Sequence, residues 1–218
     1  MTEVELIVST NSVPHRNVPQ ALTMPFAYRH RIRITVFCVI AGLCGTLLTS
    51  PDIQEGTSLD HVFDGVGWFL LGSSMLLRLW ASRHISGRKT RSLVSTGPYA
   101  VCRNPQYIGT LLIAVSQLLI LKSWPFALAC VIPIVMYVVG VVPTEERWLQ
   151  EQLGADYSDY CRLVPRWSLR WRGLNLEWGS PEKASAFRRE CVTCAWWLLL
   201  PLASEFFAGL REWISSAA

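Results

Sequence analysis

The chain has 218 residues, of which 51% are hydrophobic and only 17% are charged. An average soluble domain has about 25% charged residues, so this composition indicates a membrane protein. The formal net charge of +4 is too small for a dedicated nucleic-acid-binding protein, and no nucleic-acid partner is expected.

Five apolar segments are long enough to cross a bilayer as helices that rise 1.5 Å per residue. In chain order these predicted spans are residues 34–51, 65–82, 104–121, 123–144 and 191–210. Arg78 interrupts the second span, Glu205 interrupts the fifth, and Lys122 to Pro125 predict a tight turn between the third and fourth. The sequence therefore predicts an all-α polytopic membrane bundle of about five transmembrane helices. Residues 34–171 would form its core, between an N-terminal segment (1–33) and an interfacial and fifth-span segment (172–218).

The basic residues predict the orientation of the bundle. Alternating the spans across the membrane places 18 of the 20 Lys and Arg residues on one side. By the positive-inside rule, the N-terminus is then cytoplasmic and the C-terminus lies outside. Most of these basic side chains would contact anionic lipids, so membrane lipids are expected partners, and the sequence leaves the oligomeric state undefined.

The seven cysteines predict neither a disulfide framework nor a metal site. Their number is odd, and several lie within apolar segments, which favours reduced thiols. Cys191 and Cys194 form a C-x-x-C pair, but no second Cys or His pair follows at ligand spacing. We therefore expect no metal ligands.

A polar cluster precedes the third span, in the stretch STGPYAVCRNPQYIG. Gly97 and Pro98 predict a turn, and Pro105 suits the first turn of a helix. The N–H groups of that helix, together with the guanidinium of Arg103, would form a pocket for a carboxylate or phosphate. The same motifs are also typical of an ordinary turn and helix start, and both tyrosines of the stretch could be interfacial anchors.

A second polar cluster follows the fourth span and begins at Glu145 and Glu146. Pro143 and Thr144 predict a helix cap just before these acids, and acids in a first helical turn are also favoured by the helix dipole alone. Because the two-span hairpin goes out and back, Glu145 and Arg103 should emerge at the same membrane face. Paired acids at the membrane end of a span are costly unless they bind something, which indicates a ligand site there.

The order of these segments resembles the isoprenylcysteine carboxyl methyltransferase and phospholipid methyltransferase superfamily of integral membrane enzymes. The resemblance covers about Leu79 to Trp167 and rests on RLWASRHISGR, LVSTGPYAVCRNPQYIG, the two-span hairpin and EERWLQEQLGADYSDYCRLVPRW. It implies a small helical bundle that binds S-adenosylmethionine at its cytoplasmic face and methylates a hydrophobic or lipid-like acceptor from the bilayer.

The resemblance also implies roles for individual residues. Arg103 and Glu146 are the expected catalytic residues, with Glu146 the nearest proton acceptor if the methyl acceptor is an amine. The expected cofactor-binding residues are Arg91, Leu93, Val94, Gly97, Pro98, Tyr99, Asn104, Pro105, Gln106, Tyr107 and Glu145. Arginine and helix N–H groups suit the carboxylate of the cofactor, an acid suits its ribose diol, and aromatic faces suit its sulfonium.

Two positions depart from the family pattern. Asn104 replaces the more usual His, and Val141 stands where the isoprenylcysteine enzymes have an Arg for the substrate carboxylate. We therefore expect an amine, hydroxyl or thiol acceptor in preference to a prenylcysteine carboxylate. Two alternative functions stay open: a membrane reductase of the sterol type that uses a nicotinamide cofactor, and a non-catalytic membrane scaffold.

Overall fold

The computed structural model describes residues 26–49, 53, 56–86, 93–170, 176, 178–179, 181 and 183–217. Within these residues every regular element is a helix, and no strand is present. In chain order the helices are α2 (Phe26–Leu48), α3 (Ser58–Ile85), α4 (Pro98–Val101), α5 (Pro105–Leu121), α6 (Trp124–Val135), the π-helix η1 (Met136–Val141), α7 (Val142–Leu153), α8 (Ala155–Leu163) and α9 (Ala184–Ala217). The predicted all-α membrane bundle is confirmed.

Three helical stretches of the described residues are long and apolar enough to cross a membrane: Tyr28–Leu48, Ser58–Ile85 and Trp124–Leu153. The third predicted span corresponds to a shorter apolar helix, Pro105–Leu121. Each of the first two helices begins some residues before its predicted span, because the helix continues into the polar residues that flank the apolar run. The fifth predicted span lies inside α9, whose crossing of the membrane stays a prediction.

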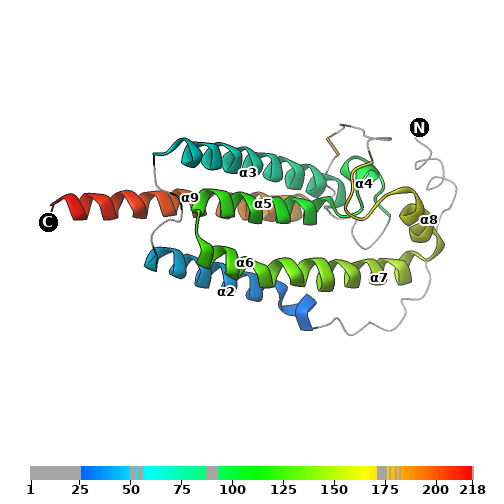
Figure 1. Ribbon diagram of the computed structural model, residues 1–218. Helices are drawn as coiled ribbons and strands as arrows, with labels where there is room; N and C mark the ends of the chain where they lie inside the picture. The colour runs from blue at the N-terminus through cyan, green and yellow to red at the C-terminus, as the bar shows by residue number, and fades with distance from the viewer. Residues whose placement is uncertain are drawn as a thin grey trace.

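The long helices lie side by side along one common direction (Figure 1). Helix α3 packs on α5 and α9, while α2 packs on α6 and η1. The short helices α4 and α8 lie together at one end of the bundle, where α5 begins and α7 ends (Figure 1). This arrangement gathers the polar residues around the third and fourth predicted spans at that one end.

The close approach of α3 and α5 depends on two glycines. A Cβ atom on Gly67 of α3 would overlap Ile120, and one on Gly109 of α5 would overlap the side chain of Arg78. Small residues let the backbones of membrane helices come close enough for van der Waals packing to stabilise them. Leu71 of α3 is fully buried at this contact.

The turn between α5 and α6 is held by polar side chains at the far end of the bundle. Lys122 has a left-handed backbone conformation, with φ 46°, and its amino group binds the carboxylates of Asp60 and Asp64 on α3. Ser123 caps α6, and its hydroxyl pairs with that of Thr46 at 2.8 Å. These bonds attach the expected tight turn between α5 and α6 to the neighbouring helices α2 and α3.

A partly buried ion pair joins α9 to the rest of the bundle. The guanidinium of Arg78 on α3 contacts Glu190 on α9, with Nη2–Oε1 and Nε–Oε1 distances of 2.6 and 2.7 Å. The same guanidinium donates to Thr110 and to the backbone of Gln106 on α5. One arginine therefore connects three helices next to the end that holds α4 and α8.

The fourth predicted span continues without a break into α7 through the wider turns of η1. The expected cap at Thr144 is wrong: Val141 precedes α7 without a side-chain cap, and Thr144 is inside the helix. A proline at the start of α7 is tolerated because its missing N–H falls where the π-helix already changes the hydrogen-bond pattern. Val142, for example, donates to the carbonyl of Tyr137, five residues earlier.

Candidate functional site

A pocket lies at the end of the bundle between α4, α5, α7 and α8, with about 620 Å³ of empty space, part of it open to solvent. Its lining residues are Ile85, Leu93, Val94, Tyr99, Arg103, Asn104, Pro105, Gln106, Tyr107, Glu145, Leu149, Leu153, Tyr157 and Tyr160. Nine of these lining residues are among those that the sequence nominated. Residues on both sides of the two-span hairpin therefore meet around one space.

The turn before α4 lies behind the pocket and positions Tyr99, which lines it. Gly97 has φ +59°, and a Cβ atom there would overlap the imidazole of His84. His84 lies in the last turn of α3, is buried, and faces the carbonyl of Trp80 through Nδ1 at 3.1 Å. The glycine thus lets the turn close against α3, which aims the following Tyr99 into the pocket.

The chain after α8 binds directly to the loop around α4. The hydroxyl of Tyr160 donates to the carbonyl of Tyr99 at 2.7 Å. The backbone N–H of Arg103 donates to the carbonyl of Pro165 at 2.9 Å, and that of Arg170 donates to Val101 at 3.0 Å. These bonds hold the tyrosines of α8 over the pocket, so the segment after α7 forms one wall of the site.

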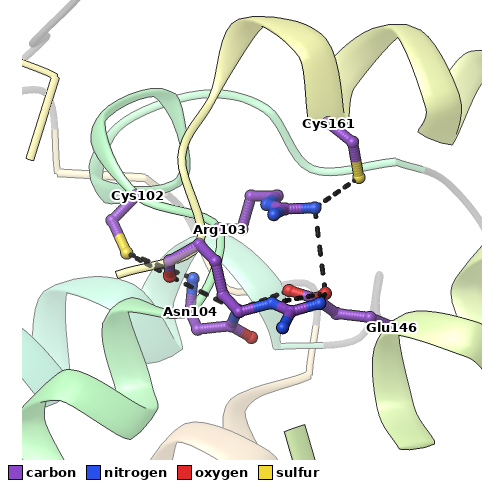
Figure 2. A network of polar contacts seen from close by, with 6 residues as sticks. Cys102, Arg103, Asn104, Glu146 and Cys161 are labelled. Carbon is purple, nitrogen blue, oxygen red and sulfur yellow. Dashed lines mark hydrogen bonds and ion pairs between the residues drawn. The ribbon is translucent and has the colours of Figure 1, made fainter. Parts of the chain in front are cut away.

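Glu146 is the centre of a buried polar network beside the pocket (Figure 2). Its Oε1 accepts a hydrogen bond from Nδ2 of Asn104 at 2.8 Å, and its Oε2 accepts from Nε and Nη2 of Arg166 at 2.9 and 2.5 Å. Nη1 of Arg103 lies 3.8 Å from Oε2 and donates to Sγ of Cys161 at 2.6 Å. Both oxygens of Glu146 are therefore engaged by protein donors.

Arg103 has one side-chain hydrogen-bond donor that the network around Glu146 does not use. Its Nε is buried, and among the residues that the structure describes it has no hydrogen-bond partner. Burial opposes the charge, but Glu146 and the thiol of Cys161 outweigh it, so the pKa of Arg103 is raised and the guanidinium stays charged. A charged group with an unpaired buried donor at a pocket is suited to bind an anion.

Glu145 faces the pocket from α7 and is buried. Its Oε2 accepts a hydrogen bond from the hydroxyl of Tyr107 on α5. The ring of Tyr107 also packs against Tyr137 of η1, with the ring centroids 5.8 Å apart. An acid and two aromatic rings therefore lie together where α5, η1 and α7 meet beside the pocket.

The π-helix explains how two residues of one helix both reach Tyr107. Tyr137 and Glu145 are eight residues apart, which in a regular α-helix would place them about 80° apart around the axis. One π turn takes up an extra residue, so the two behave as if seven residues apart, within about 20°. The side chains therefore point to the same side, toward α5.

Three pocket tyrosines outside the spans are held neutral. Burial, the nearby carboxylate of Glu145 and that of Glu190 raise the pKa of Tyr99. Burial and neighbouring ionisable groups likewise raise the pKa of Tyr157 and of Tyr160. Neutral phenol rings present apolar faces and hydroxyl donors to a ligand, but not negative charge.

The structure separates the nominated residues into groups. Gly97 and Pro98 are buried behind the pocket and do not line it, and Glu146 lies in the adjoining network. Arg91 falls outside the described residues. The other nominated residues surround the pocket: Leu93, Val94, Tyr99, Arg103, Asn104, Pro105, Gln106, Tyr107 and Glu145.

Several lining residues were not nominated from the sequence. Leu149 and Leu153 continue from Glu145 at intervals of four residues, so a single face of α7 lines the pocket, and this spacing is readable from the sequence. The sequence predicts that Tyr157 and Tyr160, which follow Gly154, cover the second polar cluster as an aromatic lid, and both line the pocket. Ile85 at the end of α3 has no sequence signal of its own.

Val141 is fully buried in η1 and lines no cavity among the described residues. Its neighbour Val142 is also fully buried, whereas Val139 is exposed on the outer surface. Neither described cavity therefore has a cation at this position of the fourth predicted span.

An all-α membrane bundle with a mixed polar and aromatic pocket at one end is the architecture that the sequence resemblance implied. Residues 66–156 match the family model for phospholipid methyltransferases, which confirms that resemblance. This region runs from within α3 to the start of α8 and so contains most of the pocket. Residues 66–156 are therefore similar to a family of membrane methyltransferases, and the apolar helices indicate an integral membrane protein.

Two relatives resemble the chain over most of its length. The cobalt-zinc-cadmium resistance protein CzcN of Cupriavidus metallidurans is 28% identical over 185 residues, which cover 84% of this chain and 83% of the relative. The nickel-cobalt-cadmium resistance protein NccN of Alcaligenes xylosoxydans xylosoxydans is 27% identical over 176 residues, which cover 79% and 80%. No solved structure gives a significant match. Among the described residues, no group of three or more His, Cys, Asp or Glu side chains could hold a metal ion.

Proposed function

We propose that the protein transfers a methyl group from S-adenosylmethionine to a hydrophobic or lipid-like acceptor at the cytoplasmic face of a membrane. The observation that supports this most is the pocket, which Arg103 and Glu145 line together with several aromatic rings. Nε of Arg103 has no hydrogen-bond partner among the described residues. The family match to phospholipid methyltransferases supports the same reaction class.

The donor set of the pocket fits this cofactor. Arg103 and the first N–H groups of α5 suit a carboxylate, and Glu145 suits a ribose diol. The faces of Tyr99, Tyr107 and Tyr157 suit a sulfonium cation. When bound, the cofactor supplies an electrophilic methyl group, and its sulfur takes the electron pair of the broken carbon–sulfur bond.

The residues of this chain would act by binding, orienting and excluding water. Leu149, Leu153 and the tyrosines of α8 enclose the pocket, and removal of water favours attack by a poorly solvated nucleophile. Arg103 is the proposed catalytic residue that lines the pocket. Glu146 was nominated as the proton acceptor, but the bonds from Asn104 and Arg166 favour a positioning role that fixes Arg103 and Asn104.

Calorimetry with S-adenosylhomocysteine on the detergent-solubilised protein tests the cofactor site. Arg103→Ala and Glu145→Ala should each weaken binding by about 1.5 kcal/mol or more, the scale of a hydrogen bond to a charged group. Arg162→Ala is the matched control, because Arg162 lies on α8 with its side chain 80% exposed and should bind like the parent. Absence of binding in a folded parent would overturn the proposal, and full binding by both site variants would overturn the residue assignment.

Two further measurements separate the alternatives. Titration with a reduced nicotinamide cofactor should show no binding, and saturable binding would favour the reductase. Radiolabelled S-adenosylmethionine offered with a membrane lipid extract should label a lipid. Binding of S-adenosylhomocysteine without transfer to any lipid would indicate a non-catalytic scaffold.

A further inference from the structure

Arg166 lies in the chain segment after α8 that binds the residues just before α5. Its backbone carbonyl accepts a hydrogen bond from the thiol of Cys102 at 3.1 Å and another from Nδ2 of Asn104 at 3.5 Å. The carbonyl of Pro165, one residue earlier, accepts the backbone N–H of Arg103 at 2.9 Å. Contacts of the backbone with three consecutive residues therefore fix the place of Arg166 independently of its own side chain.

The side chains of Arg166 and Arg103 approach the same carboxylate oxygen. Nε and Nη2 of Arg166 lie 2.9 and 2.5 Å from Oε2 of Glu146, whereas Nη1 of Arg103 lies 3.8 Å from that atom. The side chain of Glu146 is 8% exposed, and that of Arg166 is 43% exposed. Glu146 is therefore a buried acid whose nearer cation reaches it from the surface of the protein.

The two arginines differ in their relation to the proposed cofactor pocket. Arg103 lines the pocket, and its Nε has no hydrogen-bond partner among the described residues. Arg166 is not one of the lining residues. Arg166 would therefore influence a ligand in the pocket through Glu146 and Arg103, without touching the ligand itself.

The balance of charge around the pocket requires a second cation if an anion is to bind there. Glu145 lines the pocket together with Arg103, and Glu146 lies beside it within reach of the same arginine. With Arg103 alone, two carboxylates would surround one guanidinium, and the carboxylate of a ligand would meet a net negative charge. The guanidinium of Arg166 offsets the charge of Glu146, which leaves that of Arg103 free to attract an anion.

We infer that Arg166 is a positioning residue that neutralises Glu146, so that Arg103 remains available to bind a carboxylate of the ligand. This inference rests on the proposed function, and it gives Arg166 a part in recognising the amino-acid carboxylate of S-adenosylmethionine. Loss of the positive charge at position 166 would leave Arg103 as the cation that neutralises Glu146. The carboxylate of the ligand would then bind less tightly, while the other parts of the cofactor would bind as before.

Calorimetry with a matched pair of ligands tests this role. One ligand is S-adenosylhomocysteine, and the other is its carboxamide, in which an uncharged amide replaces the carboxylate. The parent protein should bind the carboxylate at least about tenfold more tightly, the scale of a hydrogen bond to a charged group. Arg166→Gln should reduce this preference about fivefold, the scale of one partly exposed ion pair, and should bind the carboxamide like the parent. Equal affinity of the parent for both ligands, or the full preference in Arg166→Gln, would overturn the inference.

Three further variants separate the charge of Arg166 from a merely structural role. Arg166→Lys keeps the positive charge and should keep the preference for the carboxylate. The double variant Glu146→Gln, Arg166→Gln removes both opposite charges and should restore the preference. Arg162→Gln is the matched control, because it removes the same charge from a side chain of α8 that is 80% exposed, and it should bind both ligands like the parent. An equal loss of affinity for both ligands in Arg166→Gln, not reversed in the double variant, would show a structural role and contradict the inference.

The parent protein separates this inference from the proposed function. A folded parent that binds neither ligand would overturn the proposed function, and the inference with it. A parent that prefers the carboxylate, with the same preference in Arg166→Gln, would overturn only the role of Arg166. If Arg166→Gln does not fold, Arg166→Lys and the double variant decide, and loss of the preference in both would contradict the inference.

Discussion

Nδ2 of Asn104 donates a hydrogen bond to Oε1 of Glu146 across 2.8 Å, joining the start of α5 to α7 inside the bundle. Both residues are buried. At this position the family pattern usually has a histidine, and the observed geometry requires only a side-chain N–H donor at that place. We therefore expect that an imidazole N–H at position 104 would bind the same carboxylate oxygen.

The effect of substituting Asn104 should depend on whether the new side chain can donate a hydrogen bond to Glu146. Asn104→His should retain the parent's stability and its binding of S-adenosylhomocysteine. Asn104→Ala should lower the free energy of unfolding by about 1–3 kcal/mol, because it leaves a buried carboxylate oxygen without its donor. Thermal unfolding and calorimetry measure both effects, and equal behaviour of the two variants would show that the donor does not matter.

The bond between Tyr160 and Tyr99 predicts a pH dependence. The pKa of Tyr160 is raised by burial first and by Tyr99 next, so the folded state disfavours its ionised form. The unfolded chain ionises near pH 10, and stability should therefore fall as the pH rises above about 10.

Tyr160→Phe checks this dependence, because the variant has no phenol to ionise at that position. It should be less stable than the parent at pH 8, where the hydrogen bond to Tyr99 is intact. The difference should narrow between about pH 9 and 11 as the parent loses its advantage. A constant difference in melting temperature over that range would contradict the assigned role of Tyr160.

Breaking the ion pair between Arg78 and Glu190 should destabilise the bundle. Glu190→Gln leaves the partly buried guanidinium without its counter-charge, and we expect a loss of about 1–3 kcal/mol in the free energy of unfolding. Glu151→Gln on the exposed side of α7 is the matched control and should change stability little. A similar melting temperature for both variants would show that α9 is held by apolar packing alone.

The orientation of the protein predicts which side of the membrane reaches Cys161. This partly exposed thiol lies on α8, at the end of the bundle that the basic residues place in the cytoplasm. A membrane-impermeant maleimide should modify Cys161 in inside-out vesicles and not in intact cells, as measured by peptide mapping. Modification in intact cells would reverse the predicted topology.

The acceptor should not be a prenylcysteine carboxylate. Neither described cavity has a cation at the position of Val141, so the carboxylate of such an acceptor would lack the partner that an Arg supplies there in the resembled isoprenylcysteine enzymes. Burial of an unpaired carboxylate costs at least several kcal/mol. Radiolabelled S-adenosylmethionine should label an amine, hydroxyl or thiol in a lipid extract more efficiently than a farnesylated cysteine analogue. Base-labile ester on the analogue, with no label in the lipid fraction, would contradict this prediction.

The convergence of Arg103 and Glu145 at one end of the bundle could be predicted from the sequence, because it follows from the order of the spans along the chain. An uninterrupted two-span hairpin must return to the membrane face from which it left, so Arg103 and Glu145 had to emerge together. Apolar length likewise predicted the helical bundle. The continuation of the α7 stripe to Leu149 and Leu153 needed only the helical period.

Other features depend on tertiary packing that no local pattern reveals. His84 would be expected in a loop, but the helix extends through it and the ring fills the space left by Gly97. Pro143 is typical of a helix start, yet the preceding π turn lets one helix continue through it. The engagement of Glu146 by Arg166 depends on how the chain folds back after α8.

The wide turn at Met136–Val141 also has a consequence for related chains of different length. A chain that lacks one residue within this turn can form a regular α-helix there and still present the counterparts of Tyr137 and Glu145 to the same neighbour. A deletion of one residue within α7 would instead rotate the leucines that follow by about 100°. Sequence alignments with such chains should therefore place a one-residue gap inside the wide turn. Glu145 then aligns with the corresponding acid of the related chain.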